Sequence, residues 1–157
     1  MLTLHFYMFP EHLPNVGEEL TSQQKREHSG MAGEYYVLSC LHRRGKDAYL
    51  TIGNHKSIDI LVRTTNGSLI TIDAKAIDEE PFPIQNACSK ENHFYALLHF
   101  GHKKGGFWDL EVNPDIYIVP SWKIRELADE HHKNIYVKHV SGYKNRWDLL
   151  DEALDGQ

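Results

Sequence analysis

Apolar and polar side chains alternate along residues 57–77, SIDILVRTTNGSLITIDAKAI, except at a short polar segment in the middle. A period of two is typical of strands that bury one face. The dipeptide Asn66-Gly67 in the interruption is a strong signal for a tight hairpin turn. We therefore predict two antiparallel strands, over 57–63 and 68–77, with their aliphatic rows on one face of a sheet.

A helical pattern covers residues 20–45, with Thr21 or Ser22 as its N-cap and Gly45 at its C-terminal end. Glycine inside a helix costs about 1 kcal/mol relative to alanine. Two glycines in this segment therefore either break the helix or let another backbone approach it closely: Gly30 and Gly33. The other elements predicted are a strand over 47–53, a polar loop over 78–92, strands over 93–101 and 114–120, a helix over 121–133 and a short strand over 134–140.

Together these elements predict an α/β fold, with a central mixed β-sheet (an antiparallel meander plus further strands) flanked by helices. The chain length of 157 residues fits one domain over 1–157. We expect residues 1–20 to form an N-terminal arm and residues 145–157 a C-terminal tail that docks and then frays. The docking side chains of this tail are Trp147, Leu149, Leu150 and Leu154.

Three charged residues interrupt the apolar pattern of the predicted hairpin. Asp59, Asp73 and Lys75 all fall at odd-numbered positions, and 14 positions separate the two aspartates. If the hairpin closes at the Asn-Gly turn, the three side chains share the face opposite the aliphatic rows. They form either an ordinary solvated face or a site.

Glu34 bears on this choice, because the predicted first helix places it in line with apolar residues. Met31, Glu34, Leu38 and Leu41 follow the spacing of one helical stripe. Burying an unpaired carboxylate costs several kcal/mol, so such a group usually has a partner. Either Glu34 lies at the edge of the helix and pairs with a lysine, or it reaches the same site as the two aspartates.

Three carboxylates around one point repel each other, and a hard divalent cation would relieve that repulsion. Mg²⁺ prefers oxygen ligands, and Mn²⁺ is the alternative. A neighbouring lysine, Lys75, would orient or deprotonate a water molecule or neutralise developing charge. These parts suit phosphodiester hydrolysis.

The helix with Glu34, the strand with Asp59 and the strand with Asp73-Ala74-Lys75 occur in the order found in the PD-(D/E)XK nuclease superfamily, which the chain resembles over about residues 30–77. The segment looks closest to Holliday-junction resolvases and small uncharacterised bacterial members. The resemblance implies a single nuclease-like domain with a restriction-endonuclease-like core that acts on DNA. It also implies that the Ala74 carbonyl and three carboxylates hold magnesium and that Lys75 is catalytic; the carboxylates are Glu34, Asp59 and Asp73.

Two positions depart from the superfamily pattern. Ile58 stands where a proline is common before the first aspartate, and Asp73 stands where glutamate is more frequent. Lys56 and Ser57 are candidates for contacting a phosphate, although a solvated loop explains them equally well. Gln85 is a candidate for supporting the site from the loop after the Asp-x-Lys strand.

Composition limits the partners. The formal net charge of −5 disfavours wholesale wrapping of nucleic acid. It favours the alternative of a catalytically inactive nuclease-fold module that binds nucleic acid or a protein. A third possibility is an unrelated small α/β protein. Because symmetric cleavage of two strands usually needs two sites, we expect a homodimer, with the apolar arm as a contact.

The remaining expectations come from residue types. Cys40 and Cys88 have no zinc-type spacing, so we expect reduced thiols in a cytoplasmic protein. The 11 histidines form no metal-ligand pattern. We expect no signal peptide, no membrane span and no small-molecule cofactor.

Overall fold

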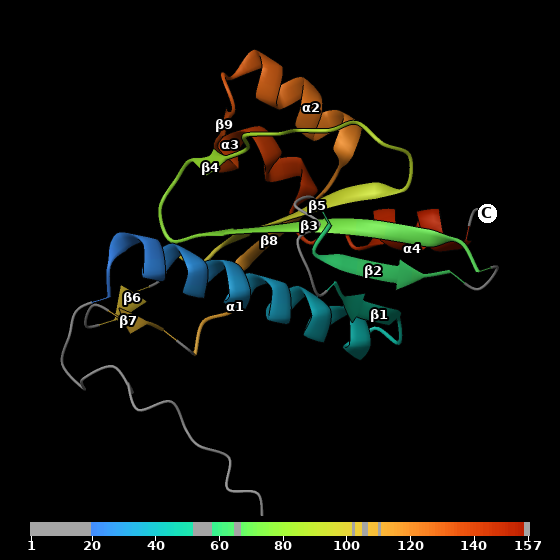
Figure 1. Ribbon diagram of the computed structural model, residues 1–157, viewed down its shortest axis with the longest axis horizontal. Coiled ribbons are helices and arrows are strands. Elements are labelled where there is room, and N and C mark those ends of the chain that lie inside the picture. The colour runs from blue at the N-terminus through green and yellow to red at the C-terminus, as the bar shows by residue number, and fades with distance from the viewer. Residues whose placement is uncertain are drawn as a thin grey trace, which may run out of the picture.

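A computed structural model describes residues 20–51, 58–64, 67–101, 103–104, 107–109 and 111–155 (Figure 1). Its central sheet has five strands, which in spatial order are β1 (Asp47–Leu50), β2 (Ile60–Arg63), β3 (Leu69–Ile77), β5 (His93–His99) and β8 (Asp115–Pro120). The first three form an antiparallel meander, β5 is parallel to β3, and β8 is antiparallel to β5. The predicted α/β fold with a mixed sheet flanked by helices is confirmed.

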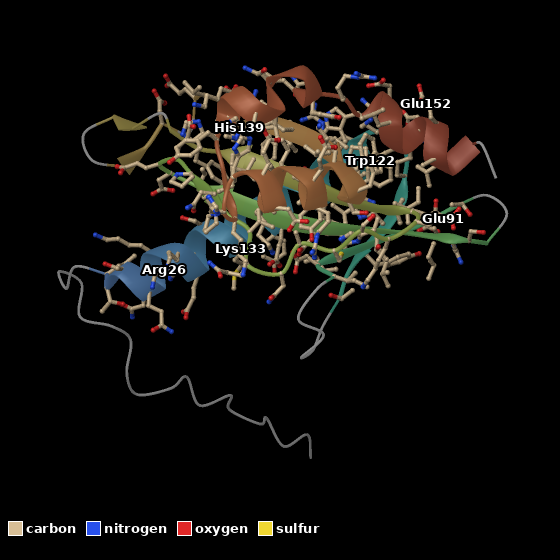
Figure 2. The ribbon with its side chains drawn as sticks, turned by 90° about the horizontal axis from the view of Figure 1, so that it is seen from above. Arg26, Glu91, Trp122, Lys133, His139 and Glu152 are labelled. Carbon is tan, nitrogen blue, oxygen red and sulfur yellow. The ribbon has the colours of Figure 1, made fainter. Side chains whose placement is uncertain are left out.

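Helices pack on both faces of this sheet. One face carries α1 (Ser22–Arg43) and α4 (Asp148–Asp155), and the other carries α2 (Ser121–Glu130), α3 (Val137–Val140) and the short 3-10 helix η1 (Ser141–Tyr143). Seen from above, α2 and the segment with His139 cover the second face (Figure 2). Two small sheets complete the fold: β4 (Phe82–Pro83) with β9 (Asn134–Ile135), and β6 (Lys103–Lys104) with β7 (Phe107–Trp108).

Two separate cores lie between these layers. The aliphatic rows of β2 and β3 pack against Val37 and Leu41 of α1 and against Trp147 and Leu150 of the C-terminal segment. The opposite face packs Tyr95, with other residues of β5 and β8, against α2, β4 and β9. Because strand side chains alternate, β5 and β8 contribute buried residues to both cores, whereas polar residues of β3 lie on the α2 side.

The first helix is continuous and does not break at its glycines. Thr21 is its N-cap and forms a capping box with Gln24, while Gly45 has a positive φ of 73° just beyond its end. A Cβ atom on Gly33 would lie 2.6 Å from the Cβ atom of Ala76 on β3. Gly33 therefore permits the predicted close approach, and it brings α1 against the strand that carries Asp73.

The predicted stripe on α1 differs from the face that the helix buries. Met31 is 58% exposed, Glu34 and Leu38 are partly buried, and of the predicted residues only Leu41 is buried. The buried residues of the helix are Ser29, Gly33, Val37 and Leu41. The pattern of apolar residues does not indicate this buried face, because Ser29 and Gly33 are not apolar. Glu34 follows Gly33 directly and is half-buried at the edge of the stripe.

The segment predicted as a strand over 134–140 is a strand only at its start, in β9, and then turns into α3. A carboxylate oxygen of Glu80 accepts a hydrogen bond from the backbone N–H of Val137 at 3.0 Å. This contact satisfies an N–H group at the start of the helical turn, as a cap does. The tertiary contact overrides the β propensity of NIYVKHV.

The predicted docking of the C-terminal tail is confirmed, and most of the tail is helical. Trp147, Leu150 and Leu154 are buried and Leu149 is partly buried against the same core. The other predicted strands exist with shorter bounds. None of the helices within the described ranges is long and apolar enough to cross a membrane.

The two glycines of α1 give a matched pair of substitutions. Gly30→Ala meets nothing within 4 Å, so we expect a gain of up to about 1 kcal/mol in the free energy of unfolding. Gly33→Ala must displace Ala76, so we expect it to lower that free energy despite the same gain in helix propensity. Urea unfolding of both variants checks this; equal stabilisation would contradict the close approach.

Candidate functional site

The register of β2 against β3 brings the two hairpin aspartates together. Ile60 pairs with Ile72, so Asp59 and Asp73, the next residues in opposite directions, lie alongside each other. The backbone N–H of Asp59 donates to the carbonyl of Ile72 at 3.0 Å. The hairpin prediction and the face shared by the aspartates therefore agree with the structure, although the turn residues 65–66 lie outside the described ranges.

Lys75 joins the two carboxylates. Its Nζ atom lies 2.9 Å from Oδ1 of Asp73 and 3.8 Å from Oδ2 of Asp59. The backbone N–H of Ala74 donates to Oδ2 of Asp59 at 2.8 Å, which fixes that carboxylate against the neighbouring strand. Asp73 is only 7% exposed, whereas the side chain of Lys75 is 38% exposed. The site therefore has a buried floor and an accessible ammonium.

Burial makes the charged form of Asp73 unfavourable. Desolvation, followed by the hydrogen bond with Asp59, raises the pKa of Asp73 to about 7, and the ammonium of Lys75 offsets only part of this. Burial lowers the pKa of Lys75, but the charges of Asp73, Asp59 and Glu34 outweigh it, so its pKa lies above the ordinary value. At neutral pH the lysine is charged and Asp73 is close to its midpoint.

Glu34 stands beside this cluster, in its electrostatic field. Burial and then the charge of Asp59 raise the pKa of Glu34, and the charge of Lys75 lowers it. Within the described part of the chain Glu34 has no hydrogen bond or ion pair. Glu34 therefore interacts with the charges of Asp59 and Lys75, but no contact among the described residues joins it to the two aspartates.

The donor chemistry of these residues fits a hard cation, because all three acidic side chains offer carboxylate oxygens. In the geometry of the described residues, however, no group of three His, Cys, Asp or Glu side chains is arranged to hold a metal ion. Asp59 and Asp73 would supply two ligands in place. Glu34 would have to turn toward them to supply a third.

The supporting residues predicted from sequence contribute less. Lys56 and Ser57 lie outside the described ranges. Gln85 is exposed in the loop after β4, and no hydrogen bond joins it to the described site residues. A cavity of about 490 Å³ lies elsewhere, between the end of α1, β2 and α4, and none of the predicted site residues lines it.

Two residues of β5 that the sequence analysis missed share the face of the site. The parallel register pairs Thr71 with His93 and Asp73 with Tyr95, so all four side chains point to the α2 side. Tyr95 is 1% exposed, and its hydroxyl accepts from the backbone N–H of Cys88 at 3.3 Å. The sequence HFYALLH places His93 and Tyr95 on the same face of a strand, but it does not indicate that this strand pairs with β3.

Comparison with family models, with curated proteins and with solved structures finds no match to this chain. The resemblance stated above therefore rests on the order of Glu34, Asp59 and Asp73-Ala74-Lys75 in the sequence.

The raised pKa of Asp73 makes stability depend on pH. In the folded chain its carboxyl keeps a proton up to about pH 7, whereas in the unfolded chain it ionises near its ordinary value of 3.8. The free energy of unfolding therefore falls as pH rises between these values. Because asparagine cannot ionise, we expect Asp73→Asn to be more stable than the wild type at pH 8, on the order of 1 kcal/mol or about 2–4 °C in melting temperature.

Thermal unfolding at pH 4 and pH 8 checks this prediction, and the difference should disappear at the lower pH. Asp129→Asn is the control, since that carboxylate is 64% exposed on α2 and pairs only with Arg125 among the described residues. An Asp73→Asn protein that is less stable than the wild type at pH 8 would contradict the claim that the ionised Asp73 carboxylate destabilises the folded protein.

Proposed function

We propose that this protein is a metal-dependent endonuclease that hydrolyses DNA phosphodiester bonds, with a restriction-endonuclease-like core. The observation that carries the proposal is that Asp59 and Asp73 lie next to each other across the β2–β3 pair. Each has a carboxylate oxygen within 4 Å of the Nζ atom of Lys75. Strongly shifted pKa values such as that of Asp73 cluster at functional sites. The order α1, three-stranded meander, then parallel β5 supports the same core.

The chain's own residues divide the work. Glu34, Asp59 and Asp73 would hold Mg²⁺ or Mn²⁺, which when bound supplies an acidified water and neutralises charge on the phosphoryl group. Lys75 would orient or deprotonate a water molecule, or neutralise charge that develops on a phosphate oxygen. The N–H of Ala74 keeps Asp59 in place at 2.8 Å.

A second function has its own support. The acidic net charge of −5 and the absence of a three-ligand group among the described residues favour an inactive module that keeps this fold and binds nucleic acid or a protein. In that case Lys75 serves only to neutralise Asp59 and Asp73. The two functions differ in whether the carboxylates matter for activity.

Cleavage assays separate them. We expect the wild type to nick supercoiled, linear or branched DNA only with Mg²⁺ or Mn²⁺. Asp73→Ala removes a metal ligand and Lys75→Ala removes the charge beside the reacting phosphate, so each should lower the rate by about 100-fold or more. Asp129→Ala, on the exposed face of α2, is the control and should cut like the wild type.

An RNA substrate assayed beside these DNAs tests the choice of nucleic acid. Wild-type protein that binds DNA without cutting it, with binding unchanged in Asp73→Ala, would support the inactive module. Cutting that survives both site substitutions would contradict the assigned residues.

Metal affinity should depend on pH because of Asp73. A cation needs the ionised carboxylate, and the pKa of Asp73 is about 7. Mn²⁺ binding should therefore release a proton and weaken by up to about tenfold per pH unit below that value. Calorimetry in two buffers of different ionisation enthalpy measures the released proton; affinity that is constant between pH 6 and pH 8 would contradict the prediction.

A further inference from the structure

His93 begins β5 and has one nitrogen with a partner and one without. The residue is 2% exposed, and its Nδ1 atom lies 2.7 Å from the hydroxyl oxygen of Thr71, its register partner on β3. Its Nε2 atom is enclosed and has no hydrogen-bond partner among the described residues. A buried polar atom left without a partner is unfavourable, so its presence calls for a physical reason.

The hydrogen bonds around Thr71 indicate which nitrogen carries the proton. The carbonyl oxygen of Asn92 already accepts from the backbone N–H of Thr71 at 2.9 Å and lies 3.5 Å from the hydroxyl, whereas Nδ1 of His93 is 2.7 Å away. We assign the hydroxyl as the donor to Nδ1, the nearer of the two acceptors. Burial, and then the charge of Lys90, lowers the pKa of His93 to about 4, so the imidazole is neutral and carries its proton on Nε2.

The unpartnered group is thus a buried donor, and its surroundings indicate what it would meet. The charge of Asp59 raises the pKa of His93 and that of Lys75 lowers it, so the ring lies within the field of the site. The ring is also on the same sheet face as Asp73. A phosphodiester cannot reach a fully enclosed atom, whereas an internal water is a partner that buried polar groups commonly share.

We propose that His93 is a positioning residue of the candidate site: its Nε2–H donates to an internal water that also bonds the Asp59–Asp73 pair, while Nδ1 holds Thr71. His93 would then fix the orientation of the Asp73 carboxylate in two ways. One is the hydrogen bond through the water, and the other is the contact with Thr71, two residues before Asp73 on β3. The hydrogen bond is inferred from the enclosed Nε2 atom, the shared sheet face and the neutral form of His93, and its effect on the reaction rests on the nuclease function proposed above.

Nitrogen-15 NMR of histidine-labelled protein at pH 7.5 tests the hydrogen bond directly, with the His93→Gln spectrum identifying the signals. We expect a proton on Nε2 that exchanges slowly with solvent. Its resonance should move in Asp59→Asn and in Asp73→Asn but not in Asp129→Asn. A proton on Nδ1, or an Nε2 resonance that neither site substitution moves, would overturn the proposal.

Single-turnover cleavage tests the positioning role. His93→Phe fills the space but removes both ring nitrogens, so we expect the rate at saturating DNA to fall about tenfold with KM unchanged. His93→Gln keeps a donor and should recover most of the rate. If His93→Phe cuts as fast as the wild type, the positioning role is wrong; if the wild type itself does not cut, the nuclease function fails and the NMR result still decides the hydrogen bond.

Discussion

The register of β2 against β3 is the constraint on which the site depends. Ile60 opposite Ile72 keeps both aliphatic rows in the core beneath α1 and α4. A slip by one residue would turn these rows outward and drive the carboxylates into that core. The same packing that stabilises the sheet therefore forces Asp59 and Asp73 together on the opposite face, where Lys75 is the cation that reaches both.

This arrangement concentrates unfavourable electrostatic energy at Asp73. Asp73 is buried beside another carboxylate, and its pKa rises to about 7 even with an ammonium 2.9 Å away. A proton or the lysine relieves the strain in the isolated chain. A divalent cation with oxygen ligands would relieve it more completely, and Glu34 on the adjoining helix, brought close by Gly33 against Ala76, stands near enough to respond to both charges.

Patterns of neighbouring residues predicted the parts of the fold that depend on strand periodicity and turn residues. The hairpin followed from its period of two and its Asn-Gly turn, and the shared face of the aspartates followed from side-chain parity. Long-range pairing was not predictable in this way. The parallel pairing of β3 with β5 brings His93 and Tyr95 to the face of the site. The 15 residues over 78–92 that connect the two strands carry no local signal of this pairing. Glu34 was placed near the site, although one residue of its supposed stripe, Met31, is exposed.

A crystal structure of the protein grown with Mn²⁺, with the metal located by its anomalous scattering, tests the central claim most directly. The account predicts a Mn²⁺ ion bound by oxygens of Asp59 and Asp73, with Glu34 turned toward it and the ammonium of Lys75 moved off the Asp73 carboxylate. Saturating Mn²⁺ that leaves Lys75 paired with both aspartates, with no metal between them, would contradict it.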